Sequence, residues 1–575
     1  MDMNDAIRQK IGQIHHMLAG ELPPPTHEAG GCQDSLVPCR DGAGLMTRTV
    51  LPAGAGPWPV IVSRNPYTPV DTIDGLNSGI LALVRYGYAV VCQQVRGLYR
   101  SQGEWYAFER EREDGLDLLE WTASQPWCDG RICLYGGSYL GHVIWAMADA
   151  LPPQVKTIYT LVWGDDPYGS FYENGMFKQA TWTLWAAQMM HPKNRSDLSQ
   201  PDLDGFRRAL DAETQMEADL AVCGRPCPWY RGWISNSCRS DPYWNQGVWK
   251  SYAAAAQSIH IPVLLQTGWF DIFLEPTWRT FSHLAPEVRA RSRLVVGPWH
   301  HGNAAPAQPD FPGEGRFGLF QVKLALEWFD AVLTGRQDRP SGVDAYVMGA
   351  GEWRHWRDIP ASKERRRLCL RPGQGSCHLL APEAGQEEAS LTYRYDPLRP
   401  VPSRGGKLLM NYNEWTAEPE CAALQPSPGA RDDVCSFLSP PLDAPVTVVG
   451  ALTVRLAVSS DAPDTAFTAK LMEARPDGCA VSICDGISTL AFRDGDHRRQ
   501  PYTPGQRAEV EFPLPVTAWR FPVGSRIRVD VSSSNYPAFH RHPNTNRPWA
   551  QEAPCVPTSQ TLYLGGASWI ELPLV

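Results

Sequence analysis

The length of 575 residues exceeds what one hydrophobic core supports, so two or three domains are expected. The composition, with 43% hydrophobic and 20% charged residues, is typical of packed soluble proteins and argues against disordered or fibrous classes. The formal net charge of -9 and the lack of a basic stripe argue against nucleic acid as a partner. No apolar run is long enough to span a membrane.

The N-terminal segment and the cysteines predict a cytoplasmic protein. The first residues have no apolar core of a secretory signal. The 15 cysteines have no regular spacing, which is typical of reduced thiols. Cys223 and Cys227 form a close pair, but no second Cys or His pair stands nearby to complete a zinc site. No metal or other cofactor is therefore expected, and a homodimer remains open.

Residues 1–150 show the pattern of a parallel sheet with crossover helices. Short β-branched runs occur at 60–62, 88–91 and 132–135. Between the last two, residues 111–123 carry apolar side chains at helical spacing among acidic ones. This alternation predicts the first part of an α/β domain.

Residues 151–240 have a different texture, rich in Trp, Met and Ala, which predicts a helical cap inserted into the α/β domain. The strand pattern resumes at 262–266 and 293–297, so residues 241–356 form the second part of that domain. The insertion therefore interrupts the α/β domain without ending it.

Residues 357–575 predict a separate all-β domain. Apolar residues alternate with period two at 452–458 and again at 527–531, and segments rich in Pro and Gly separate such runs. This pattern predicts a β-sandwich of the jelly-roll type. The basic run at 363–367 is predicted to be a solvated linker at the start of this domain.

A candidate nucleophile, Ser138, lies where a predicted strand meets a predicted helix. Small residues flank it in the run Gly136-Gly137-Ser138-Tyr139-Leu140-Gly141. Small flanking residues permit the strained turn that exposes a serine hydroxyl, and the helix that follows aims N–H groups at a developing oxyanion. The second glycine comes one residue later than in the G-x-S-x-G pattern.

A serine needs a base and a carboxylate that orients the base, and later strands supply both. Asp271 follows the strand at 262–266, and His300 and His301 follow the strand at 293–297. The order Ser, Asp, His is that of α/β-hydrolases. The residues alone leave both histidines open as the base.

These motifs resemble those of the cocaine esterase and X-Pro dipeptidyl-peptidase family, the CocE/NonD α/β-hydrolases. The matches are the GxSYxG elbow at 136–141, the GW(Y/F)D segment at 268–271 and the GPWxH segment at 297–301. The resemblance covers nearly the whole chain, including a C-terminal jelly roll. It implies that His301, and not His300, is the base.

The resemblance also implies an oxyanion hole and an acyl pocket. The turn Arg64-Asn65-Pro66-Tyr67 is similar to the family's RxPY turn, so the Tyr67 hydroxyl and the backbone N–H of Tyr139 would bind the oxyanion. The positions that match the family's pocket are Trp185, Phe273, Leu409 and Met410. The chain departs from the family at Gln93-Gln94, where Gln-Asp is usual, which puts in doubt a salt bridge near Arg96.

The predicted function is hydrolysis of a small-molecule carboxylic ester with an apolar or aromatic acyl group through an acyl-enzyme. An X-Pro dipeptidyl peptidase, an acylase or amidase, and an acyltransferase would use the same residues, and a non-catalytic binding protein is the alternative from another class. Apolar residues directly behind Asp271 disfavour recognition of a substrate ammonium, although Glu275 keeps it open. Asp165 and Asp166 are predicted to lie in a solvated loop, and binding of a cation or a substrate amine is the alternative for this pair.

Overall fold

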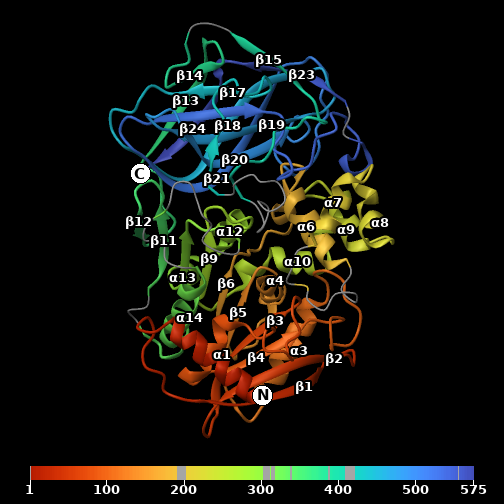
Figure 1. The fold of residues 1–575 in the computed structure, drawn as a ribbon, viewed down its shortest axis with the longest axis vertical. Helices are drawn as coiled ribbons and strands as arrows, with labels where there is room; N and C mark the ends of the chain where they lie inside the picture. The colour runs from red at the N-terminus through yellow and green to blue at the C-terminus, as the bar shows by residue number, and fades with distance from the viewer. Residues whose placement is uncertain are drawn as a thin grey trace.

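The computed structural model describes residues 2–190, 198, 202–301, 311, 317–336, 340–385, 389–407, 421–553 and 556–575. Two large sheets organise them (Figure 1). The first, with its helices, forms the lower part of the view, the helices of the predicted cap lie on the right, and the second sheet forms the top. Leu409 and Met410 lie outside the described residues.

The first sheet has ten strands within the described residues, in the order β1-β2-β4-β3-β5-β6-β9-β10-β11-β12. The strands are β1 (Ala29–Pro38), β2 (Gly44–Pro52), β3 (Trp58–Asn65), β4 (Ala89–Gln94), β5 (Cys128–Gly137), β6 (Val155–Leu161), β9 (Val263–Gly268), β10 (Arg293–Gly297), β11 (Gly342–Val347) and β12 (Glu352–Trp356). From β4 to β11 in this order the neighbours are parallel, while β1, β2 and β12 pair antiparallel.

Helices cover both faces of this sheet, so its strands are buried on both sides. Alternate residues such as Ile61 and Leu264 pack with one group of helices, and their neighbours Val62 and Leu265 pack on the opposite face. The first group is α1 (Met3–Met17), α2 (Ser78–Leu81) and α14 (Phe317–Leu333), and the second includes α3 (Glu111–Ala123) and α4 (Tyr139–Trp145). The predicted helix at 111–123 is confirmed with its predicted bounds.

A run of helices lies between β6 and β9. It comprises α5 (Pro167–Phe171), α6 (Gln179–Met189), α7 (Leu203–Asp211), α8 (Ala218–Cys223), α9 (Pro228–Ser235), α10 (Gly247–Ala253) and α11 (Ala255–Ser258), with the hairpin β7 (Tyr172–Glu173) and β8 (Met176–Phe177). Every residue of α6 is buried. Ala180 at its start donates to the carbonyl of Pro537, so this helix touches the C-terminal domain. The helices α12 (Leu274–His283) and α13 (Pro286–Arg289) come after β9 in the chain.

The second sheet has twelve strands within the described residues. No α-helix occurs among the described residues that follow α14. The strands are β13 (Glu364–Gln374), β14 (Cys377–Ala381), β15 (Ser390–Tyr395), β16 (Leu424–Gln425), β17 (Cys435–Leu438), β18 (Val446–Ser460), β19 (Ala466–Ala474), β20 (Ala480–Thr489), β21 (Ala508–Phe521), β22 (Arg526–Ser532), β23 (Thr558–Tyr563) and β24 (Gly565–Leu574). The predicted fold class, an α/β-hydrolase domain with a helical insertion followed by an all-β domain, is confirmed.

The prediction of a solvated linker at 363–367 was wrong. Residues 364–367 form the start of β13, which pairs with β24. Arg365 and Arg367 on this strand both form ion pairs with Glu571 of β24, and Arg367 also lies over the ring of Trp569. Cross-strand pairing with an acidic residue lets a basic run form an exposed strand.

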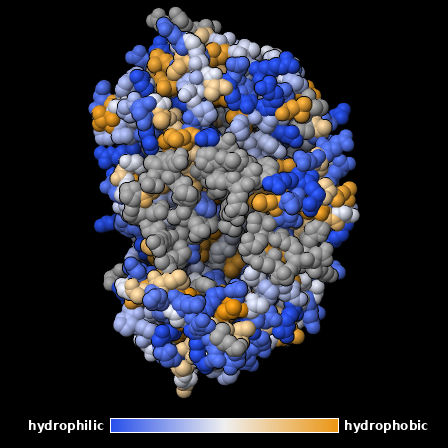
Figure 2. All heavy atoms as spheres, in the orientation of Figure 1, coloured by the Kyte–Doolittle hydropathy of each residue, from blue (hydrophilic) through white to orange (hydrophobic). Residues whose placement is uncertain are grey.

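None of the helices in the described ranges is long and apolar enough to cross a membrane. Figure 2 shows hydrophilic residues at both ends of the molecule, with hydrophobic residues scattered among them in the coloured part of this face.

Candidate active site

Ser138 lies in a strained turn between β5 and α4. Its backbone has φ 54° and ψ −127°, a conformation that costs about 1 to 3 kcal/mol for a residue with a side chain. Gly136 makes the turn possible, because a Cβ at this position would lie 2.2 Å from the carbonyl oxygen of Leu140. The hydroxyl of Ser138 therefore stands above the carboxyl end of β5, in the middle of the parallel strands.

His301 and Asp271 follow the neighbouring strands β10 and β9, so the sheet brings them to the same edge as Ser138. Nε2 of His301 lies 2.9 Å from Oγ of Ser138. Nδ1 of His301 lies 3.5 Å from Oδ1 of Asp271, a long hydrogen bond. Asp271 is fully buried, and its Oδ1 also accepts from the backbone N–H of Phe273 at 2.6 Å. The carboxylate is thus fixed by the first turn behind β9.

His300, the rival base, is buried beside the site. Burial, together with the charge of the adjacent His301, lowers the pKa of its imidazole to about 4, although the charge of Asp271 acts in the opposite direction. His301 is the histidine whose ring nitrogen faces Oγ of Ser138. The geometry therefore favours His301 over His300 as the partner of Ser138.

The hydroxyl of Tyr67 lies over the turn at Ser138. Burial raises the pKa of this phenol, and hydrogen bonds with Trp185, Ser138 and the backbone of Tyr139 act in the opposite direction. The indole Nε1 of Trp185 donates to Tyr67 Oη at 3.2 Å. A neutral phenol and the N–H of Tyr139 are thus close enough to Oγ to donate to the same oxyanion.

A buried network connects the two turns that carry these donors. Arg64, three residues before Tyr67, donates from Nη1 to Glu111 Oε2 at 2.6 Å and from Nε to Gln93 Oε1 at 2.8 Å. Glu111 on α3 also accepts from Oη of Tyr139 at 2.8 Å. Burial raises the pKa of Glu111, whereas the charge of Arg64 lowers it. One carboxylate therefore connects β3, which leads into the turn of Tyr67, with Tyr139, which follows Ser138.

Gln94, which stands where the family usually has Asp, supports the same turn. Its Nε2 donates to the carbonyl of Asn65 at 2.6 Å, and its Oε1 accepts from the N–H of Val70 at 3.1 Å. The salt bridge that this departure put in doubt is made by another residue. Arg96 pairs with Asp114 at 2.5 Å and with Asp41 at 2.9 Å.

A small cavity of about 20 Å³ adjoins Ser138 and has room for about one water molecule. Two of the predicted pocket residues, Trp185 and Phe273, line it. The ring of Phe273 lies 5.4 Å from that of His301 and 4.2 Å from that of Trp163, measured between centroids. The other lining residues are Tyr67, Phe108, Ser138, Tyr139, Trp163, Thr181, Trp182, Ile272 and His301.

The prediction of a solvated loop for Asp165 and Asp166 was wrong, because both side chains are buried. Burial alone would raise the pKa of Asp166, but the guanidinium groups of Arg239 and Arg279 lower it to about 2. Arg239 also pairs with Asp496 of the C-terminal domain at 2.8 Å. These ion pairs join residues far apart in the sequence, which composition does not reveal.

Glu275, on the first turn of α12, is paired with a lysine of the C-terminal domain. Its Oε2 lies 2.7 Å from Nζ of Lys407. This pairing compensates the charge through which Glu275 would attract an ammonium group.

The sequence did not predict Phe108 and Trp163 in the wall of the cavity or Glu111 as the partner of the Tyr139 hydroxyl. The one available signal in the sequence was Tyr139, directly after Ser138, because a buried tyrosine hydroxyl needs a hydrogen-bond partner.

Comparisons with known proteins agree with this architecture. Residues 41–303 match the family model of X-Pro dipeptidyl-peptidase (S15 family), and residues 335–568 match that of the X-Pro dipeptidyl-peptidase C-terminal non-catalytic domain. Cocaine esterase of Rhodococcus sp. (strain MB1 Bresler) is 33% identical over 547 residues, which cover 90% of this chain and 93% of the esterase.

Two solved structures share the fold. An aminopeptidase from a marine sediment archaeon (Thaumarchaeota archaeon) superposes with a TM-score of 0.81 at 23% identity, covering 97% of this chain and 98% of the other. An α-amino acid ester hydrolase superposes with a TM-score of 0.79 at 22% identity, covering 97% and 99%. The chain therefore belongs to the cocaine esterase and X-Pro dipeptidyl-peptidase (CocE/NonD) family of α/β-hydrolases.

Proposed function

We propose that this protein is a serine carboxylesterase in which Ser138, His301 and Asp271 form a catalytic triad. The observation that carries the proposal is the 2.9 Å separation of His301 Nε2 and Ser138 Oγ at a strained strand-to-helix turn. The esterase function of the Rhodococcus relative supports it.

In this mechanism Oγ of Ser138 attacks the ester carbonyl while its proton passes to Nε2 of His301. Asp271 orients the imidazole and stabilises its protonated form. Tyr67 and the N–H of Tyr139 donate to the oxyanion. The tetrahedral intermediate collapses when His301 returns the proton to the leaving alcohol, which leaves an acyl-Ser138. Water, deprotonated by His301, then hydrolyses the acyl-enzyme to the acid.

The acyl group is apolar or aromatic, because the lining of the cavity beside Ser138 is dominated by aromatic side chains. An α-amino acyl group is disfavoured, because Phe273 stands behind Asp271 and Glu275 is paired with Lys407. The chain works in the cytoplasm, a proposal supported by the described cysteines, all of which are free thiols.

A hydrolysis panel tests this function. It contains benzoyl and acetyl esters of one alcohol, an α-amino ester and an X-Pro anilide, each assayed for kcat/KM. The proposal predicts that the benzoyl ester is the best substrate. A preference for the X-Pro anilide would instead assign the protein an X-Pro dipeptidyl-peptidase activity. A preference for the α-amino ester would assign it amino-ester hydrolysis.

Phe273→Ala tests the pocket in the same assay. Removal of the ring takes away apolar area that would bury the acyl group, worth about 25 cal/mol per Å². The ratio of kcat/KM for the benzoyl ester to that for the acetyl ester should fall. A higher ratio in the variant would mean that Phe273 fills the acyl site and blocks large acyl groups.

A further inference from the structure

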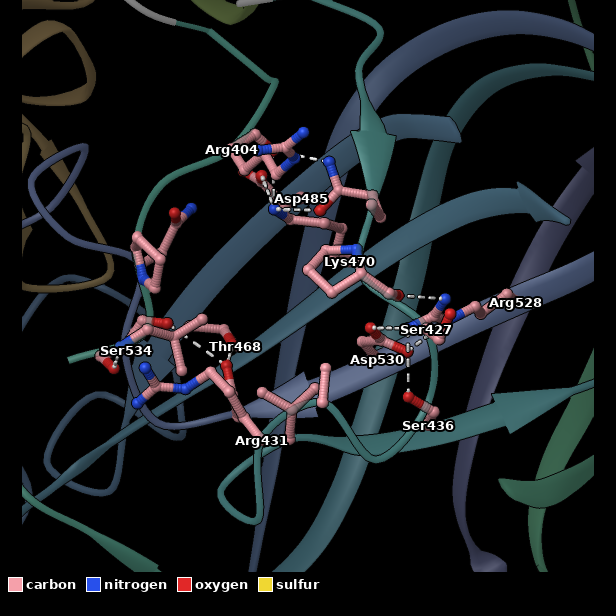
Figure 3. Close-up of a pocket in the computed structure, with 18 of the residues that line it drawn as sticks. Arg404, Ser427, Arg431, Ser436, Thr468, Lys470, Asp485, Arg528, Asp530 and Ser534 are labelled. Carbon is pink, nitrogen blue, oxygen red and sulfur yellow. Dashed lines mark hydrogen bonds and ion pairs between the residues drawn. The ribbon is translucent and has the colours of Figure 1, made fainter. Parts of the chain in front are cut away.

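A cavity of about 140 Å³ lies in the C-terminal domain and shares no lining residue with the cavity beside Ser138. Figure 3 shows its polar side chains converging from several strands. The strands β17, β22, β19 and β20 form its floor, and the segments at 401–404 and 426–434 form its other walls. It is several times larger than the space one water molecule needs.

The strand register sets four polar side chains of the floor in one row. Ser436 of β17 pairs with Asp530 of β22, Asp530 pairs with Lys470 of β19, and Lys470 pairs with Asp485 of β20. Residues directly opposite on neighbouring strands point to the same face of a sheet. The alternate residues of β22, such as Val529, point to the hydrophobic core.

Charges along the cavity are largely compensated by one another. Arg528 donates to both carboxylate oxygens of Asp530, at 2.8 and 2.7 Å. Arg431 donates in the same manner to Asp433. Lys470 lies 3.8 Å from Asp485. These ion pairs leave little net electrostatic attraction for a small ion in the cavity. At one end of the cavity, the guanidinium of Arg404 donates to the carbonyl of Leu424.

Two polar side chains of the lining, the partly buried Asp485 and the buried Asn535, keep hydrogen-bonding capacity toward the cavity. The side chain of Asp485 is 11% exposed and lies 3.8 Å from Nζ of Lys470, longer than a hydrogen bond, and the charge of its carboxylate also raises the pKa of Lys407. Asn535 is 8% exposed, and its side-chain amide makes no hydrogen bond to a described residue. Buried polar groups in native proteins are nearly always hydrogen-bonded, so a carboxylate and an amide of this kind fit a ligand that offers donors and acceptors.

The segments at 401–404 and 426–434 add the apolar side chains of Val401, Pro402, Pro426 and Val434 to the lining, together with the polar side chains of Arg404, Ser427 and Arg431. The cavity thus offers both hydrogen-bonding groups and carbon surface to a ligand. We propose that it binds a neutral polyol of monosaccharide size, whose hydroxyls donate to Asp485 and exchange hydrogen bonds with Asn535. The C–H face of such a ring packs against the prolines.

Calorimetric titration of the full chain with glucose, galactose, mannose, xylose and myo-inositol, each alone, tests the proposal. At least one should bind with one-to-one stoichiometry and raise Tm. Asp485→Asn removes a charged acceptor and should weaken this binding about tenfold or more. Asn535→Ala should weaken it as well. The matched control is Asp443→Asn, the same change at an exposed position of this domain, which should leave the affinity unchanged.

Three results would overturn the proposal. The first is that no polyol of the panel binds at millimolar concentration, or that acetate, benzoate or phosphate binds in its place. The second is that binding occurs but resists both Asp485→Asn and Asn535→Ala in variants that unfold cooperatively. The third is that binding disappears when Ser138 carries a fluorophosphonate label, because the ligand would then occupy the catalytic pocket.

Discussion

His301 and His300 are adjacent, but their side chains have different neighbours. Nε2 of His301 faces Ser138, and the imidazole of His300 has a pKa lowered to about 4 chiefly by burial. A general base has to reach the proton that it removes, so the position of its ring favours His301. The family motif, which places the base at the last residue of GPWxH, agrees with this geometry.

We predict that His301→Ala lowers kcat for the best ester by several orders of magnitude, whereas His300→Ala retains most of the activity. The reason is that the imidazole of His301 faces Oγ of Ser138 at 2.9 Å. Steady-state kinetics of the two variants, with Tm measured for each, check this expectation. Equal losses in two well-folded variants would leave the base unassigned, and a larger loss for His300→Ala would reverse the assignment.

Between elements, the turn after β3 and the turn after β5 are connected through α3. Glu111 on this helix accepts from Arg64, near the end of β3, and from the hydroxyl of Tyr139, which follows Ser138 in the turn after β5. The side chain of Tyr139 thus positions its own backbone N–H. A displacement of a catalytic group by about 1 Å can cost about 10²-fold in rate, so the support of this turn bears on kcat.

Tyr139→Phe tests the connection, because it keeps the backbone N–H and removes the hydrogen bond to Glu111. We expect kcat to fall about tenfold with KM little changed. Tyr67→Phe, which removes an oxyanion donor outright, should cost more, about 10² to 10³-fold. The control is Tyr86→Phe, because the hydroxyl of Tyr86 donates to the carbonyl of Pro23, far from Ser138. If Tyr139→Phe raises KM and leaves kcat unchanged, the hydroxyl does not position the oxyanion hole.

Across the whole molecule, ion pairs join the inserted helices, α12 and the C-terminal domain. Asp166 at the start of α5 accepts from Arg239 at 2.6 Å and from Arg279 of α12 at 2.8 Å. Arg239 pairs in turn with Asp496. Because α12 begins three residues after Asp271, these contacts connect the outer parts of the molecule to the segment that carries Asp271.

Asp166→Asn leaves two guanidinium groups without their carboxylate. It should lower the free energy of unfolding at neutral pH by about 2 to 3 kcal/mol, the amount that corresponds to the fall in the pKa of Asp166 from 3.8 to about 2. The difference from the wild type should depend on pH. The pKa of Asp166 is lowered from 3.8 to about 2, so its stabilisation is present above pH 3.8 and is lost as the pH falls toward 2. Urea unfolding at neutral pH and at about pH 3 measures both differences. A difference that does not shrink with acidity would contradict the assignment.

The strands and the order of the three catalytic candidates were predictable, because both are local properties of the sequence. Alternation at 452–458 and the strand at 293–297 needed no knowledge of distant residues. Pairings over long separations were not predictable. The basic run at 363–367 forms a strand because β24, about 200 residues later, supplies Glu571. Asp166 is buried because Arg239 and Arg279 come to it from other elements.

The central claim is that Ser138 is the nucleophile. Its most direct test is mass spectrometry of the intact protein after reaction with a fluorophosphonate, followed by peptide mapping, in the wild type and in Ser138→Ala. We predict one adduct per chain, located on Ser138 and lost in the variant, together with a fall in kcat of about 10⁶-fold, the loss seen when a triad nucleophile is removed. An adduct on another residue, or ester hydrolysis near the wild-type rate by Ser138→Ala, would contradict the mechanism.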